Sequence, residues 1–229
     1  MRIVAAVLTR NQYEHDRRDL FEQTIDSLAA ERISTFVVDN GSTDGTDRLV
    51  AAGDEWIPYL STGPNTTCGF GTWTCCRLLA GTDADLCVVS DDDMVWQAGF
   101  ADRLAAWWDD APDELVLTGG HLEPEFPWNQ IGTTVRYGNI AGVLRDSTGA
   151  ASWTWPRRHY GRLAQAARQV PIDRQGQWDV PVCNRLVRAG WTIGQTDLAD
   201  HAGQGRSSWG NRTELLYGWD VDQVRERLR

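Results

Sequence analysis

Apolar residues in the first part of the chain follow two different spacings. Short runs rich in β-branched residues at positions 3–8 and 33–38 predict buried strands. Between them, residues 18–30 repeat apolar side chains at the spacing of a helix. The residues that share this helical face are Leu20, Phe21, Ile25 and Leu28. Together these elements predict a strand, a helix and a second strand that form one βαβ unit.

The same alternation continues to about residue 90. A helix through residues 49 and 50 is followed by a short strand near 57–60 and a helix over about 70–79. A fully apolar strand is then expected at 86–89. Strands that alternate with helices predict an α/β fold, in which a mostly parallel, Rossmann-like sheet carries helices on both faces.

The pattern loosens after Leu117, where glycines and prolines interrupt every period. Helical spacing returns at about 158–168 and again at 179–189, where we expect Gly190 to end the helix. Two last elements are expected, a strand at 191–193 and a terminal helix at 214–227.

Polar residues follow three of the predicted strands. Ligands of open α/β sheets bind outside the carboxyl ends of the strands, so these turns should lie along one edge. The turns contain Thr9 and Asn11, then Asp39 and Asn40, then Asp91, Asp92 and Asp93.

Three consecutive carboxylates at a strand end repel one another unless a cation offsets their charge. The alternative interpretation is that they cap a helix over about residues 96–107, because acidic residues suit a helix N-terminus. Capping needs only one carboxylate, which favours a cation at Asp91, Asp92 and Asp93.

Further motifs occur in a definite order along the chain. Val-Val-Asp-Asn-Gly-Ser-Thr-Asp-Gly-Thr occupies 37–46, Gly-Phe-Gly occupies 69–71, and Ser-Asp-Asp-Asp-Met occupies 90–94. A segment that opens with Asp179 and ends in Arg, Ala, Gly and Trp follows, and His201 then precedes a loop rich in Gly and Ser.

In this order the motifs, with Thr-x-Asn at 9–11, resemble the inverting glycosyltransferases of family two over about residues 2–210. The resemblance implies the GT-A fold and one domain over residues 1–229. It implies a nucleotide-sugar-binding half at 1–118 and an acceptor-binding half at 119–229. Trp178 and Pro181 stand where that family usually has acidic residues.

The resemblance also implies a role for individual residues. Asp39 matches the residue that binds the nucleotide base, and Asp179 matches the catalytic base. The resemblance implies that Asp91, Asp93 and His201 are ligands of a Mn²⁺ or Mg²⁺ ion. It implies further contacts with the nucleotide sugar for Thr9, Asn11, Asn40, Gly71, Asp91 and Asp92. The alternative interpretations are a helix cap for Asp179 and a loop histidine for His201.

The implied function is a metal-dependent inverting glycosyltransferase that moves a sugar from a nucleotide-diphosphate sugar, with a UDP-sugar favoured, to a hydroxyl acceptor. The acceptor is left open between a glycan, a small molecule, a protein and a hydroxymethylated base in viral DNA. A sugar-phosphate nucleotidyltransferase is one alternative, although residues 9–12 read Thr-Arg-Asn-Gln rather than a Gly-rich basic loop. A non-catalytic carbohydrate-binding module is the other.

Composition narrows the chemistry. All 22 basic residues among the 229 are Arg, against 32 acidic residues and a net charge of −10. The absence of Lys excludes a Schiff-base, P-loop or general-base lysine. The excess of acidic residues argues against nucleic acid as a binding partner, except as the acceptor of the sugar. No apolar run is long enough for a membrane span and no secretory signal is recognised, so a cytoplasmic protein is expected.

Two groups of side chains have open interpretations. The five Cys lack CxxC spacing, and we expect reduced, mostly buried thiols. Several Trp in the second half are either acceptor-stacking platforms or core: Trp128, Trp153, Trp155, Trp209 and Trp219. A basic cluster either meets an anionic acceptor or the donor diphosphate, or is solvated: Arg157, Arg158, His159 and Arg162.

Overall fold

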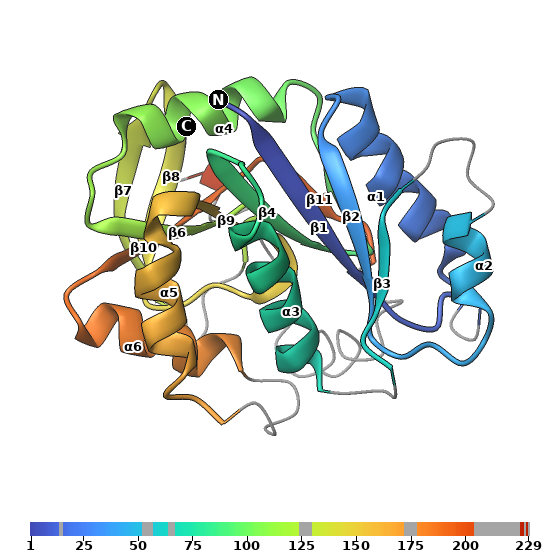
Figure 1. Ribbon diagram of the computed structural model, residues 1–229. Coiled ribbons are helices and arrows are strands. Elements are labelled where there is room, and N and C mark those ends of the chain that lie inside the picture. Colours follow the sequence, from blue (N-terminus) through green and yellow to red (C-terminus); the bar gives the residue numbers. More distant parts are fainter. Residues whose placement is uncertain are drawn as a thin grey trace.

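The computed structural model describes residues 1–13, 16–51, 57–63, 67–123, 130–171 and 178–203, with residues 225, 226 and 228. A nine-stranded sheet forms the centre of this described part (Figure 1). Its strands are β1 (Ile3–Thr9), β2 (Ser34–Asp39), β3 (Tyr59–Ser61), β4 (Leu86–Asp91), β6 (Leu115–Gly119), β7 (Ile131–Tyr137), β8 (Ile140–Arg145), β9 (Trp153–Pro156) and β10 (Thr192–Thr196).

The strands lie in the order β3-β2-β1-β4-β9-β6-β10-β8-β7. The pairings make β8 and β9 antiparallel to their neighbours, so the other seven strands of this sheet point the same way. A separate two-stranded sheet pairs β5 (Met94–Trp96) with β11 (Ala199–His201). The expected mostly parallel α/β sheet is therefore confirmed.

Helices cover both faces of the sheet. They are α1 (Arg18–Ala30), α2 (Thr46–Ala51), α3 (Cys68–Ala80), α4 (Phe100–Asp110), α5 (Tyr160–Ala167) and α6 (Asp179–Arg188), with the short 3₁₀ helices η1 (Ala150–Ser152) and η2 (Arg157–His159). Figure 1 shows α3 and α5 in front of the sheet. All seven residues of β1 are buried, as the apolar run predicts for a strand covered on both faces.

Side chains of β1 alternate between two apolar cores. Val4 and Ala6 join a cluster with residues of α3, α5 and α6, whereas Ala5 and Val7 join one with residues of α1 and α4. This alternation follows from the two-residue period of a strand. Leu79 of α3 and Leu104 of α4, both fully buried, are central to the two cores.

The carboxyl ends of β1, β2 and β4 meet at one edge of the sheet. Register pairs Thr9 with Asp39 and Leu8 with Asp91. The backbone N–H of Asn40 also donates to the carbonyl of Thr9 at 2.9 Å. The turns that were expected to lie side by side therefore do so.

The structure corrects one expected helix. Trp96 ends β5 instead of beginning a helix over 96–107, and α4 begins at Phe100. Gly99, with φ of 74°, makes the left-handed turn into α4. The three acids are thus separated from α4 by a strand and do not cap it.

Smaller differences concern boundaries and the second half. Helix α3 begins two residues before the expected 70–79, because Thr67 caps it by accepting a hydrogen bond from the Phe70 N–H. The hairpin of β7 and β8 lies where no period was recognised. Most of the helix expected at 214–227 lies outside the described residues.

The thiols and the helix lengths match expectation. All five cysteines are free, and four of them, Cys75, Cys76, Cys87 and Cys183, are buried. Among the helices that the structure describes, none is long and apolar enough to cross a membrane.

Candidate functional site

Asp39 lies at the carboxyl end of β2 with its carboxylate held from two sides. Ser42 donates to Oδ1 through its N–H at 3.0 Å and its hydroxyl at 2.5 Å, and the Tyr59 hydroxyl donates to Oδ2 at 2.5 Å. Burial and the neighbouring Asp39 raise the pKa of Tyr59, so Tyr59 stays a donor. The Asp39 side chain is therefore fixed in one orientation at the sheet edge.

The turn after β1 packs onto the turn after β2. Asn11 adopts a left-handed conformation with φ of 48°, and its Oδ1 accepts the Thr43 N–H at 3.0 Å. Its own N–H donates to the Ser42 hydroxyl at 2.8 Å. Asn11 and Asp39 are thus joined through Ser42 in one buried polar network, and the strand register sets Thr9 beside Asp39, as the order of the strands predicts.

Gly71 lies where α3 approaches this edge most closely. A Cβ at Gly71 would come within 2.7 Å of Leu8 Cδ1 and 3.3 Å of Asn40 Cγ. The Asn40 side chain donates to the Thr67 carbonyl at 3.3 Å. The missing side chain at Gly71 therefore lets the first turn of α3 lie against Asn40.

The three acids after β4 have different surroundings. Asp92 accepts hydrogen bonds from the Arg10 N–H at 3.3 Å and from the Gln12 side chain. One Arg17 nitrogen, Nη2, reaches Asp92 Oδ1 at 2.8 Å and Asp93 Oδ2 at 2.6 Å. We call Asp91, Asp92 and Asp93 together the acid cluster.

His201 joins the acid cluster because β11 pairs with β5. The register sets His201 opposite Met94, and the Ala202 N–H donates to the Asp93 carbonyl at 2.9 Å. His201 Nε2 then lies 3.1 Å from Asp93 Oδ2. Two residues that are 108 positions apart in the sequence are thus in direct contact.

The carboxyl groups of the acid cluster differ in pKa. Burial raises the pKa of Asp91, and repulsion by Asp93 and Asp92 raises it further. Burial also acts to raise the pKa of Asp93, but His201 and Arg17 outweigh this effect and lower it. Asp93 therefore holds its negative charge most strongly of the three, and His201, whose pKa Asp93 raises against the effect of burial, is its partner.

The donor set suits a divalent cation. In the described part of the chain no group of three or more His, Cys, Asp or Glu side chains has the arrangement of a metal site. Asp93 Oδ1, however, is buried with no hydrogen-bond partner among the described residues. A carboxylate oxygen of this kind beside an imidazole and a second carboxylate is the chemistry that Mn²⁺ or Mg²⁺ takes. Asp91, Asp93 and His201 could hold such an ion.

Asp179 begins α6 and faces η1. Its Oδ2 accepts the Ala150 N–H at 3.1 Å, and its Oδ1 accepts the Val180 N–H at 2.9 Å. Burial, opposed by these hydrogen bonds and assisted by Glu123, raises the pKa of Asp179 to about 6. The carboxylate therefore combines a fixed position with a proton affinity near neutrality.

Glu123 is a second carboxylate beside Asp179. It accepts the Gly149 N–H at 2.9 Å and the Gln195 side-chain amide at 2.8 Å. The consecutive N–H groups of Gly149 and Ala150 thus hold Glu123 and Asp179 respectively. A Cβ at Gly149 would lie 2.4 Å from Glu123 Oε1 and 3.8 Å from Asp179 Oδ2, so the two carboxylates flank one small space.

His121 connects this pair to the acid cluster. Its Nε2 lies 3.6 Å from Glu123 Oε1, and its ring centroid lies 5.8 Å from that of His201. Burial lowers the pKa of His121 to about 3, so this ring is neutral. A continuous row of titratable side chains therefore runs from Asp93 through His201, His121 and Glu123 to Asp179.

Three residues of this site escaped the sequence analysis. His121 and Glu123 follow the end of β6, which points the same way as β1, so their place after a strand end was an available signal. Arg17 precedes α1 in an Arg-Arg pair, which carries no local signal of burial.

The basic cluster lies elsewhere. The Arg157 N–H donates to the Asp85 carbonyl at 2.9 Å, beside the amino end of β4, whereas Asp91 ends that strand. Arg162 donates to the Asp113 carbonyl at 2.5 Å. The possibility that this cluster meets the donor diphosphate at the Asp91 edge is therefore wrong.

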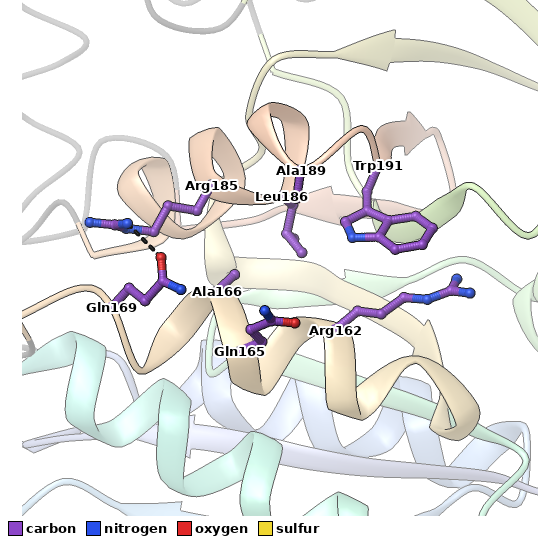
Figure 2. A pocket seen from close by; sticks show the side chains of 8 residues that line it. All are labelled: Arg162, Gln165, Ala166, Gln169, Arg185, Leu186, Ala189 and Trp191. Carbon is purple, nitrogen blue, oxygen red and sulfur yellow. Dashed lines mark hydrogen bonds between the residues drawn. The ribbon is translucent and has the colours of Figure 1, made fainter.

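Two other candidate features also fall outside the site. Trp153 and Trp155 are fully buried and belong to the core, while Trp128, Trp209 and Trp219 lie outside the described residues. A pocket of about 70 Å³ lies between α5 and α6. Figure 2 shows the side chains that line it. The pocket is lined by Arg162, Gln165, Ala166, Gln169, Arg185, Leu186, Ala189 and Trp191, of which only Arg162, in the basic cluster, was a candidate from the sequence.

Comparison with solved structures establishes the fold. No protein-family model and no curated protein sequence matches the chain. Among solved structures, the mannosyltransferase PcManGT from Pyrobaculum calidifontis, in complex with GDP-Man and Mn²⁺, matches with a TM-score of 0.56 at 16% identity over 84% of this chain. The chain has the fold of a glycosyltransferase.

Two structures of TarS from S. aureus match the same fold. The TM-score is 0.57 at 14% identity for each, over 85% of this chain for TarS and 86% for TarS 1–349. This chain spans 53% of the PcManGT chain and 35% and 58% of the two TarS chains. Because one fold hosts many activities, the reaction must be argued from the site.

Proposed function

We propose that the chain is a metal-dependent inverting glycosyltransferase of GT-A type, related to family two. It transfers a sugar from a nucleotide-diphosphate sugar, with a UDP-sugar favoured, to a hydroxyl acceptor. The observation that carries the proposal is the continuous row from Asp93 and His201 to Asp179. This row supports a leaving-group site at Asp93 and His201 and a base with a proton affinity near neutrality at Asp179.

The donor is assigned to residues 1–118. Asp39 with Thr9 and Asn11 would bind the nucleotide base and ribose, and Asn40 and Gly71 would line the path to the diphosphate. The connected hydrogen bonds of these turns support this assignment, because a rigid polar surface loses little entropy on binding. GDP-Man in the PcManGT structure supports a nucleotide-sugar donor.

Asp91, Asp93 and His201 would hold the divalent cation, with Asp92 bound to backbone and side-chain donors behind them. When bound, a divalent cation neutralises the charge that builds on the departing diphosphate without any proton transfer. Because the chain has no Lys, either Arg or a divalent cation must meet the charge of a diphosphate, and the acid cluster supports a divalent cation.

Asp179 would act as the general base, and residues 119–229 would bind the acceptor. The acceptor oxygen forms the new bond to the anomeric carbon while the bond from that carbon to the diphosphate oxygen breaks on the opposite face. The acceptor proton passes to Asp179, whose pKa of about 6 leaves it ionised and basic at neutral pH. Glu123, on the other side of the same small space, would hold the acceptor in position.

A transfer assay with Asp179→Asn tests this assignment. UDP-, GDP- and dTDP-sugars are incubated with Mn²⁺ and glycan, small-molecule, protein or hydroxymethylated-DNA acceptors, and release of nucleoside diphosphate is measured. The variant should bind donor normally and lose about 10²–10⁴ in rate, which is the usual contribution of a positioned base.

Asp83→Asn is the matched control, because Asp83 is 73% exposed and pairs only at the surface with Arg2. It should transfer at the rate of the unmodified protein. Unchanged turnover in Asp179→Asn would remove Asp179 as the base, and release of pyrophosphate in place of nucleoside diphosphate would favour a nucleotidyltransferase.

A further inference from the structure

Arg17 is the cation that the acid cluster holds in the described structure. Its Nη2 bridges Asp92 Oδ1 at 2.8 Å and Asp93 Oδ2 at 2.6 Å. The three side chains are 11%, 7% and 4% exposed, in the order Arg17, Asp92, Asp93. This ion pair is therefore shielded from water, unlike the pair of the adjacent Arg18 with Glu22, where Arg18 is 58% exposed.

We propose that Arg17 is a displaceable counter-cation, which neutralises the acid cluster without metal and must release Asp93 before a divalent cation can bind there. The inference rests on the metal site of the proposed function. It makes Arg17 a positioning residue that weakens binding of the metal alone, so that the site takes up metal and donor together.

Arg17 and a divalent cation would compete because both would contact the same carboxylate oxygen of Asp93. Asp93 Oδ2 contacts both Arg17 Nη2 and His201 Nε2, the latter at 3.1 Å. Mg²⁺ binds a carboxylate oxygen at about 2.0–2.1 Å, and Arg17 Nη2 already lies 2.6 Å from Asp93 Oδ2, so both cations cannot contact this oxygen from the same side. Two cations at that distance from the same oxygen also repel each other strongly in a site shielded from water.

The acid cluster is built so that Arg17 can leave without loss of the fold. The Arg17 N–H donates to the Gln12 carbonyl at 2.9 Å, and the Arg17 carbonyl accepts the Leu20 N–H at 3.0 Å, so the backbone stays in place at the start of α1. Asp92 keeps its bonds from the Arg10 N–H and the Gln12 side chain. Only the side chain of Arg17 needs to move.

Asp93, unlike Asp92, has a carboxylate oxygen that no described group satisfies. Its Oδ1 is buried without a hydrogen-bond partner in the described part of the chain, and a Cβ at Gly203 would meet Oδ2 at 2.1 Å. Gly203 therefore packs directly against the Asp93 carboxylate, where any side chain would clash. Without Arg17, Asp93 would keep the His201 contact at Oδ2 and offer Oδ1 to a cation.

Titration of Mn²⁺ alone, without nucleotide, tests the proposal. Arg17→Gln removes the charge but keeps a polar side chain of similar length, and it should bind Mn²⁺ about tenfold or more tightly than the unmodified protein. Arg18→Gln, the matched control on the neighbouring exposed residue, should bind Mn²⁺ like the unmodified protein. Equal or weaker binding of Mn²⁺ by Arg17→Gln would overturn the proposal.

A second measurement needs no variant. In NMR spectra of the unmodified protein, the Arg17 Nε–H signal should shift and exchange faster with solvent when Mg²⁺ is added. A signal that does not change at saturating Mg²⁺ would overturn the displacement. If Mn²⁺ binds the unmodified protein and Arg17→Gln equally, only this inference fails, because donor-dependent transfer tests the proposed function separately.

Discussion

The proton affinity of Asp179 is set by its immediate neighbours. Burial raises its pKa, the N–H groups of Val180 and Ala150 lower it, and the charge of Glu123 raises it again, to about 6. A base must be ionised to accept a proton from the acceptor hydroxyl, and it accepts it more readily when its pKa approaches the working pH. The position of Asp179 at the start of α6 therefore decides its chemistry as much as its residue type.

The pH dependence of transfer tests this account of Asp179. Protonated Asp179 cannot act as a base, so kcat/KM should rise with pH and level off above a midpoint near 6. Glu123→Gln removes a negative neighbour that raises the pKa of Asp179, so its midpoint should lie at lower pH. A rate that is constant between pH 5 and 8, or a midpoint that Glu123→Gln moves upward, would contradict the account.

Helices and strands whose apolar residues recur with a regular period could be predicted from the sequence. The elements that were missed depend on contacts with distant parts of the chain. Strand β5 is three residues long and exists through its antiparallel pairing with β11, about a hundred residues away. No local pattern reports such a pairing, so a helix that begins at Trp96 matched the sequence equally well. The position of His201 depends on the same pairing, so only the family resemblance, and not the residue pattern, pointed to it.

Helix α3 also acts on the site through Trp178, one of the two residues that depart from the pattern of family two. Trp178 is 3% exposed and lies against Trp153, at a ring-centroid distance of 5.9 Å. A Cβ at Gly69 would come within 2.6 Å of both Cβ and Cγ of Trp178. The first turn of α3 therefore sets the position of Trp178 and, through the next residue, of Asp179.

Substitution of Gly69 should expose this dependence. Gly69→Ala forces Trp178 to shift, which should lower the free energy of unfolding by about 1–3 kcal/mol and reduce transfer. Gly161→Ala is the control in α5, where no described atom lies within 4 Å of the new Cβ, and it should raise stability by about 0.4–1 kcal/mol. Urea unfolding measures both, and a Gly69→Ala protein as stable as the unmodified one would contradict this packing.

At the scale of the whole molecule, parallel strands collect residues from distant parts of the chain at one sheet edge. The carboxyl ends of β1, β2 and β4 could be aligned from the sequence, because buried strands of an α/β sheet are recognisable one by one. The residues that join this site from other elements could not be predicted from the sequence. Arg17, His121 and Glu123 reach the site through side-chain contacts between elements. The acceptor likewise depends on the second half of the chain, where local periods are weak.

Binding of nucleoside diphosphates tests the central claim most directly. UDP, GDP and dTDP are titrated by calorimetry into the unmodified protein and into Asp93→Ala, each with and without Mn²⁺. Our account predicts that at least one of them binds the unmodified protein in a Mn²⁺-dependent manner, and that Asp93→Ala loses the Mn²⁺ dependence because the ionised carboxylate beside His201 is gone. Absence of binding by all three with Mn²⁺, or full Mn²⁺-dependent affinity in Asp93→Ala, would contradict it.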